Sequence, residues 1–369
     1  MNGSNRIDLA ILPEAVRPGL IAVSLCALLF LYSAAVAAGE SKPVWQPVEF
    51  ALLGDMPYNA DQREEFIRLM DELNAADLAF VIHAGDFWFD GLGWNETSTG
   101  LPPCSDDVMN DRHDIASNSA HPFILVPGDN EWTDCYRAKP SAYAPLERLA
   151  KLREMFYPDD KTLGKQSIKV TRQSASNEYR DFRENSRWAK NGVLFVTLHI
   201  VGSNNNRGRT EEMDAEYRKR DAANLAWLRE SFKIARENDV RAMMLVAHAN
   251  PQFENTWPAR QQNRYLLRGL GLEPTGKRRE TGYDNFLAAL EEETIEFGKP
   301  VYFAHGDTHT FRIDKPLLDS FNGRLVENFT RVETFGYPDT HWIRVIIDPE
   351  NPNVLIFSQE IVAENRAAH

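Results

Sequence analysis

The chain has 369 residues, of which 43% are hydrophobic and 11% aromatic, which is enough to bury a core of full size. Its formal net charge at pH 7 is −13 and its pI is about 5.3. A broadly acidic surface repels nucleic-acid backbones and anionic membranes, so no nucleic-acid partner is expected. An anionic substrate would need local positive charge, and bound metal is one way to supply it.

The first 38 residues have the pattern of a targeting segment. Two arginines precede an apolar stretch over residues 19–36, which ends in an alanine-rich run. This order predicts a signal peptide over residues 1–38, cleaved after Ala37 or Ala38, and a mature protein that is periplasmic or secreted, with no stable membrane insertion. The alternative is an uncleaved membrane anchor, because the apolar stretch approaches the length that spans a bilayer.

Cleavage would also change the cysteine count. It would remove Cys26 and leave an even pair, Cys104 and Cys135. In an oxidising compartment such a pair is a candidate disulfide, and two unpaired thiols are the alternative. The bond would join the loop after one candidate metal ligand to the loop after another.

From residue 45 onward the chain alternates apolar runs with helical periods. Strands are predicted at residues 48–53, 78–82, 123–126, 193–198, 242–246 and 301–304. Helices are predicted at about 60–75, 145–156, 211–237 and 284–297. Two segments rich in turn residues or charge are predicted as loops, after residue 87 and at about 257–281, the second containing Lys277, Arg278 and Arg279. Beyond residue 311 the pattern predicts strands, among them 342–347 and 354–357, and no helix.

Strands that alternate with helices, followed by strands alone, favour a layered α/β fold with further strands added to its sheets. No break in composition marks a second domain. We therefore expect a single domain over residues 45–365, with loop insertions near 87–120 and 131–190.

Five of the predicted strands end in side chains that can bind metal. These are Asp55, Asp86, Asp129, His248, and the pair Asp307 and His309. Ligands bind at the carboxyl ends of strands in open α/β sheets, and the glycine before each acid would leave room beside its side chain. A single Gly-Asp is more often a turn than a ligand. Five such ends in one domain predict oxygen and imidazole donors on one rim, as a pair of divalent cations requires.

These motifs resemble those of the calcineurin-like metallophosphoesterase superfamily, in the broad group that includes purple acid phosphatases. The family pattern is D-x-H, G-D, G-N-H-E or G-N-H-D, a lone His, and G-H-x-H. The matching stretches of this chain are residues 54–57, 85–86, 128–131, 246–248 and 306–309. The resemblance implies a four-layer αββα sandwich, in which two mixed β-sheets pack face to face with helices outside and a metal site lies at the C-terminal strand ends.

The resemblance also implies a set of metal ligands. Asp86 would bridge two divalent metal ions, and Asp55 and His309 would complete one of the two sites. The other site would be completed by Asp129, His248 and Asp307. The implied reaction is hydrolysis of phosphate mono- or diesters of a small phosphorylated substrate by a metal-bound hydroxide, without a covalent protein nucleophile.

The chain departs from the family pattern in three of the motifs. Pro57 stands where the first motif often has a ligand His, and Tyr58 or solvent is left to fill that place. Asn130 replaces the His near the leaving group, while Asp129 and Asp307 replace neutral donors. The resulting site is rich in hard oxygen, which favours Mn²⁺, Mg²⁺, Ca²⁺ or Fe over Zn²⁺.

The candidate catalytic residues are Asn130, which could orient substrate by hydrogen bonding, and His248. The leaving group needs another proton donor, for which His83, His199, His305 and water are candidates, and hydrogen-bonded support of the site is the alternative role of these histidines. A less positive site also predicts an alkaline-shifted or slower hydrolase. The rival hypothesis, which the three departures favour, is a catalytically weak or inactive metal-binding or interaction protein on the same scaffold.

Overall fold

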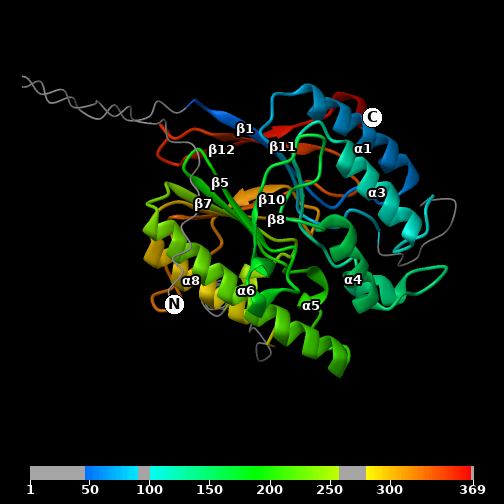
Figure 1. The fold of residues 1–369 in the computed structure, drawn as a ribbon. Coiled ribbons are helices and arrows are strands. Elements are labelled where there is room, and N and C mark those ends of the chain that lie inside the picture. The colour runs from blue at the N-terminus through cyan, green and yellow to red at the C-terminus, as the bar shows by residue number, and fades with distance from the viewer. Residues whose placement is uncertain (1–45, 90–99, 257–279, 367–369) are drawn as a thin grey trace, which may run out of the picture. The chain divides into compact units, whose positions relative to one another are not determined.

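The computed structural model describes residues 46–89, 100–256 and 280–366. The expected signal segment and the Lys277, Arg278 and Arg279 run lie outside these residues. Residues Pro47–His369 form one compact unit, built on two β-sheets with helices on their outer faces (Figure 1).

The first sheet has five strands in the order β12-β11-β1-β2-β3. β1 (Val48–Leu53), β2 (Val81–His83) and β3 (Phe123–Leu125) are parallel to one another. β11 (Trp342–Ile347) runs antiparallel to β1, and β12 (Leu355–Glu360) runs antiparallel to β11. Because β1, β2 and β3 are parallel, the residues that follow them emerge at the same edge of the sheet.

The second sheet has seven strands in the order β4-β5-β6-β7-β8-β10-β9. Its four central strands are parallel: β6 (Val193–Thr197), β7 (Ala242–Val246), β8 (Val301–His305) and β10 (Phe329–Glu333). Its outer strands are antiparallel to their neighbours: β4 (Thr171–Arg172), β5 (Ser186–Lys190) and β9 (Arg312–Asp314).

The two sheets pack face to face on a shared core. Since successive side chains of a strand point to opposite faces, Phe50 on β1 faces the second sheet, whereas Ala51 faces the helices. The ring of Phe50 lies 4.8 Å from that of Phe80 and 5.3 Å from that of Phe195 on β6, with ring centroids as the reference points. Trp188 on β5 stacks on Phe195 at 5.2 Å, so four aromatic rings span the space between the sheets.

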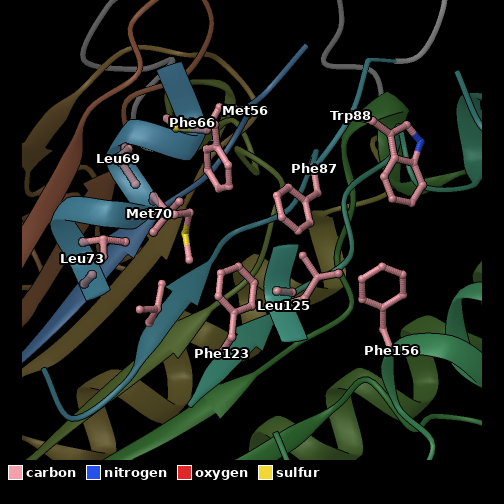
Figure 2. Packing of buried hydrophobic residues seen from close by; sticks show 14 of the residues in the cluster. Met56, Phe66, Leu69, Met70, Leu73, Phe87, Trp88, Phe123, Leu125 and Phe156 are labelled. Atoms are coloured by element: carbon pink, nitrogen blue, oxygen red, sulfur yellow. The ribbon is translucent and has the colours of Figure 1, made fainter. Parts of the chain in front are cut away.

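The outer face of the first sheet is covered by α1 (Ala60–Ala75), α3 (Asp106–Asn118) and α4 (Pro145–Phe156). α1 begins at Asn59, whose side chain accepts a hydrogen bond from the backbone of Gln62 at 2.8 Å. Its buried stripe includes Phe66, which packs against Phe87 with ring centroids 5.4 Å apart (Figure 2). This packing fixes the helix directly beside the loops that follow β1 and β2.

The outer face of the second sheet is covered by α6 (Glu211–Glu237) and α8 (Asp284–Phe297), which lie side by side (Figure 1). The ring of Phe286 on α8 lies 5.5 Å from that of Phe303 on β8, and Phe232 on α6 lies 5.9 Å from Phe297 on α8. The remaining described helical elements are short: α5 (Gly202–Asn205), η1 (Thr133–Arg137), η2 (Gln173–Ala175), η3 (Asn177–Tyr179), η4 (Phe253–Asn255) and η5 (Ala363–Asn365).

The four-layer sandwich with two mixed sheets confirms the expected fold class. One prediction was wrong, because the insertion at 87–120 is not only loop but contains the helix α3. Ser105 caps that helix by accepting from the backbone of Val108, and two acids follow in the first turn. Its buried apolar side chains are few, so the helical period is weak in the sequence. Within the described ranges, no helix is long and apolar enough to cross a membrane.

Candidate metal centre

The predicted metal ligands meet at one edge of the sandwich. Asp55, Asp86 and Asp129 follow β1, β2 and β3 of the first sheet, whereas His248 follows β7 and Asp307 follows β8 of the second. Two sets of donors have all their ligand atoms within 4.8 Å of one another: Asp55, Asp86 and His248, and Asp129, His248 and Asp307. The motifs therefore form one cluster that both sheets supply.

The first set is held together by contacts between the sheets. The backbone N–H of Asp307 lies 2.9 Å and 3.1 Å from the two carboxylate oxygens of Asp55 and donates to them. The predicted ligand His309 belongs to neither set, but its Nε2 lies 3.6 Å from Asp55 Oδ1, while its Nδ1 donates to the carbonyl oxygen of Tyr337 at 2.9 Å. The imidazole is thus oriented with Nε2 towards the carboxylates.

The second set is centred on His248. Its Nδ1 donates to the carbonyl oxygen of Ala84 at 3.0 Å, which directs Nε2 at Asp129 Oδ1, 3.1 Å away, and at Asp86 Oδ1, 3.4 Å away. The backbone N–H of Asn130 also donates to Asp86 Oδ1 at 3.0 Å. His248 is therefore the residue that the two sets share, and Asp86, which belongs to the first set, lies within 3.4 Å of it.

Tyr58 lies at the gap that Pro57 leaves in the first motif. Its Oη is 3.0 Å from Asp86 Oδ2 and 3.2 Å from His309 Nε2. Burial raises the pKa of this phenol well above its usual value, and the charge of Asp86 raises it further. The phenol hydroxyl is therefore part of the cluster, in contact with two of the predicted ligands.

Several of the predicted ligands have a left-handed backbone. The φ angles are 55° at Asp55, 54° at Asp86, 78° at Asp307 and 55° at His309. Each such residue is strained by on the order of 1 kcal/mol or more, and strain of this kind is concentrated at functional sites. The folded scaffold holds these side chains in a conformation that they would not adopt alone.

The glycines before the acids provide the expected space. A Cβ atom added at Gly306 would lie 2.0 Å from Asp55 Oδ2, and one added at Gly128 would lie 2.1 Å from Asp86 Oδ1. Gly85 also has a φ of +96°, so a side chain there would be strained as well as crowded. At Gly306 and Gly128 the close approach of a carboxylate excludes a side chain, whereas at Gly85 the backbone conformation and the neighbouring His248 exclude it.

The charges of the cluster are poorly balanced by the protein. Burial raises the pKa of Asp55 to about 8, that of Asp307 to about 6, and that of Asp86 well above its usual value. Burial also opposes ionisation of Asp129, but the hydrogen bond from His248 holds its pKa below the usual range. Burial alone would lower the pKa of His248, but the neighbouring carboxylates, chiefly Asp86, raise it well above its usual value. Buried carboxylates at this density fit divalent cations, which would compensate their charge.

The other residues with predicted roles lie around this cluster. The side-chain amide of Asn130 donates to the carbonyl oxygen of Trp88 at 3.0 Å. His83 and His305 are fully buried, and burial lowers the pKa of each to about 3. Burial also lowers the pKa of His199 to about 4, and this side chain hydrogen-bonds to Glu184 at 2.6 Å and to Trp132 at 3.1 Å. These contacts favour support of the surrounding loops over proton donation to a substrate.

Glu131 is a supporting residue that sequence reasoning missed. This fully buried carboxylate accepts hydrogen bonds from the backbone N–H groups of Asp86 at 3.1 Å, Phe87 at 2.5 Å and Gly128 at 2.5 Å. It therefore joins the loops after β2 and β3. The acid at the end of the third family motif was the signal that could have identified it.

A left-handed turn next to Asp129 was also missed. Residues 203–206 all have positive φ, between 48° and 65°. The turn is held by Arg220, which donates to Asn205 Oδ1 at 2.5 Å, and by Tyr283, whose hydroxyl accepts from the backbone of Asn205 at 3.2 Å. A Cβ atom on the preceding Gly202 would lie 2.7 Å from Asp129 Oδ2. Three consecutive asparagines, a residue that tolerates this conformation, were the signal in the sequence.

Cys104 and Cys135 form a disulfide bond. The candidate disulfide of the sequence is therefore present, and free thiols were the wrong alternative. Both sulfur atoms lie 3.5 Å from the carbonyl oxygen of Asn130. The bond packs directly behind the third motif, whose backbone holds Asp86.

The chain is similar to known proteins in sequence and in fold. The sequence model of the family described as calcineurin-like phosphoesterase matches residues 48–311. Among solved structures, the chain is similar to a dimetal phosphatase from Danio rerio, with a TM-score of 0.50 and 11% identity over 86% of this chain and 96% of that one. It is also similar to PhoD, with a TM-score of 0.48 and 11% identity over 82% of this chain and 64% of that one. No curated protein matches the chain.

Proposed function

Because the chain belongs to the calcineurin-like phosphoesterase family and is a metallophosphoesterase, we propose that it hydrolyses small phosphate mono- or diesters outside the cytoplasm. The observation that supports this most is the pair of donor sets that share His248 at the carboxyl edge of both sheets. Two divalent cations bound there would polarise the phosphate oxygens and lower the pKa of a water molecule that attacks phosphorus.

The ligands that we propose are those that the family motifs imply, and the contacts of the cluster support them. Asp86 would hold both ions, and Asp55 and His309 would complete one site. The second site would be completed by Asp129, His248 and Asp307. The protein would otherwise contribute rigidity, since Nδ1 of His248 is fixed by a carbonyl oxygen and Asp86 by a backbone N–H group.

The chemistry of the donors also suggests which metal binds. Four carboxylates and only two imidazoles make a hard, oxygen-rich set, which favours Mn²⁺, Mg²⁺, Ca²⁺ or Fe over Zn²⁺. With so much negative charge, the pKa of a bound water would be lowered less than in a histidine-rich site. We therefore expect an alkaline-shifted pH profile or slow turnover.

Two independent features support export. The first 38 residues have the pattern of a cleaved signal peptide, and the folded domain contains a buried disulfide. Expression of the full chain, followed by fractionation and intact-mass measurement, tests this proposal. A chain that retains its first 38 residues and fractionates with the cytoplasm would contradict it.

The function is tested by metal analysis of the purified protein, followed by assays on a phosphomonoester and a phosphodiester with added Mn²⁺. We expect bound metal and turnover in the wild type, and loss of both in Asp86→Asn. The matched control is Asp114→Asn on α3, because that side chain is 78% exposed and should leave turnover unchanged. Bound metal without turnover of either ester would favour the inactive metal-binding protein instead.

A further inference from the structure

Tyr58 stands one residue after the position at which the first motif lacks its histidine. Its Oη contacts Asp86 Oδ2 at 3.0 Å and His309 Nε2 at 3.2 Å, atoms of two side chains that we propose as ligands of the same metal ion. We propose that Tyr58 is a metal ligand of this site and replaces the imidazole of the usual first motif with a phenolate oxygen. The inference rests on the proposed metal centre and concerns the way in which this chain completes it.

The backbone around Tyr58 is held firmly. Its N–H donates to Gln62 Oε1 at 2.6 Å, one turn into α1. The buried guanidinium of Arg112 donates to the carbonyl oxygen of Pro57 at 3.3 Å and to that of Phe87 at 2.8 Å. Arg112 thereby links the loop after β1, which carries Tyr58, to the loop after β2, which carries Asp86. A ligand on this loop would be preorganised.

The ring of Tyr58 is also confined by its neighbours. It stacks on Tyr337 with ring centroids 5.8 Å apart and an interplanar angle of 13°, and it lies 5.9 Å from Phe89. The carbonyl oxygen of Tyr337 accepts from Nδ1 of His309, and its N–H donates to the carbonyl oxygen of Asp55 at 3.0 Å. The residue that packs against Tyr58 thus also positions two of the three other proposed ligands of this site, Asp55 and His309.

The chemistry of a phenol suits this position. Asp129 and Asp307 already stand where the family has neutral donors, and a phenolate continues this replacement by hard oxygen. When the phenol coordinates the ion, its O–H bond breaks, the proton passes to solvent and a metal–oxygen bond forms, with no change in oxidation state. A phenol that only hydrogen-bonds to Asp86 would keep its proton, which gives the two roles different signatures.

The test compares wild type, Tyr58→Phe and Tyr302→Phe. Tyr302→Phe is the matched control, because Tyr302 lies near the start of β8, away from the cluster. The hydroxyl that this variant removes donates to the carbonyl oxygen of Asn353. Metal content is measured after dialysis against graded chelator, and visible absorption after loading with Fe³⁺. We expect Tyr58→Phe to lose one ion at a chelator concentration about ten-fold or more lower than wild type. We also expect it to lack the phenolate-to-Fe³⁺ charge-transfer band that wild type and Tyr302→Phe show.

The outcomes separate this inference from the proposed function. If wild type and Tyr58→Phe hold two ions equally well and have the same spectrum, Tyr58 is not a ligand, although the metal centre stands. If wild type holds no metal under any loading condition, the metal centre itself is refuted, and the role of Tyr58 with it. Loss of the band and of one ion in Tyr58→Phe alone supports the inference.

Discussion

The disulfide between Cys104 and Cys135 should stabilise the fold by a calculable amount. The two cysteines are 31 residues apart, and the loop that they close contains α3, β3 and the third motif. Closing a loop of this size in the unfolded chain removes conformational entropy equivalent to about 3.7 kcal/mol at 25 °C. A domain of about 320 residues has an unfolding entropy near 0.7 kcal/mol/K, so loss of the bond should lower the Tm by about 5 to 6 °C.

The assay is thermal unfolding of wild type and of the double variant Cys104→Ser, Cys135→Ser, each with and without reductant. We expect the variant to melt about 5 to 6 °C below the oxidised wild type and to be insensitive to reductant. Since the backbone N–H of Asn130 holds Asp86, we also expect the variant to lose metal at a lower chelator concentration. A variant that melts within about 1 °C of a wild type shown by mass to be oxidised would refute the reasoning.

Three further predictions concern the support and the charge of the centre. The two carboxylate oxygens of Glu131 together accept from three backbone N–H groups, and Glu131→Gln replaces one of these oxygens by an NH₂ donor. We therefore expect a loss of about 2 to 3 kcal/mol in the free energy of unfolding and weaker metal retention. Unchanged denaturant melts would contradict this prediction. Because the raised pKa values of Asp55 and Asp307 make the folded, metal-free protein bind more protons than the unfolded chain, its stability should fall as the pH rises from about 4 to 8. Thermal melts in chelator at pH 5 and pH 8 measure this stability, and a higher Tm at pH 8 would contradict the prediction. Added Mn²⁺ should stabilise the protein most at the higher pH. Gly306→Ala should displace Asp55 and abolish metal binding, whereas Gly298→Ala, at a helix end with no atom within 4 Å of the added Cβ, should cost about 1 kcal/mol of stability and leave metal content unchanged.

The sequence predicted the parts of the centre that follow buried strands. Asp55, Asp86 and His248 each stand directly after an apolar run, and a strand end is a local pattern that a single sequence displays. Glu131 was not recognised, because its partners are backbone N–H groups of a loop that lies 44 and 45 residues earlier in the chain. Every residue except proline has a backbone N–H group, so no residue pattern reveals which of them a distant side chain will bind.

Other elements were missed because their local signal was weak. The helix α3 has a polar composition with few apolar side chains on its buried face, so turn residues before it dominated the prediction. The strand β10 was not predicted as a separate element. Gly336, which follows this strand, was missed as well, although an added Cβ there would lie 2.7 Å from the Cβ of Asp55. Contacts between the ends of distant strands depend on the packing of the two sheets, which residue periodicity does not encode.

The rings between the sheets have a consequence for the reaction. Phe50 and Phe80 come from the sheet that carries Asp55 and Asp86, whereas Phe195 and its neighbours come from the sheet that carries His248. The thickness of this aromatic layer sets the distance between the two sheets, and therefore the separation of ligands that are carried by different sheets. The geometry of the metal centre therefore depends partly on buried aromatic residues that lie between the sheets.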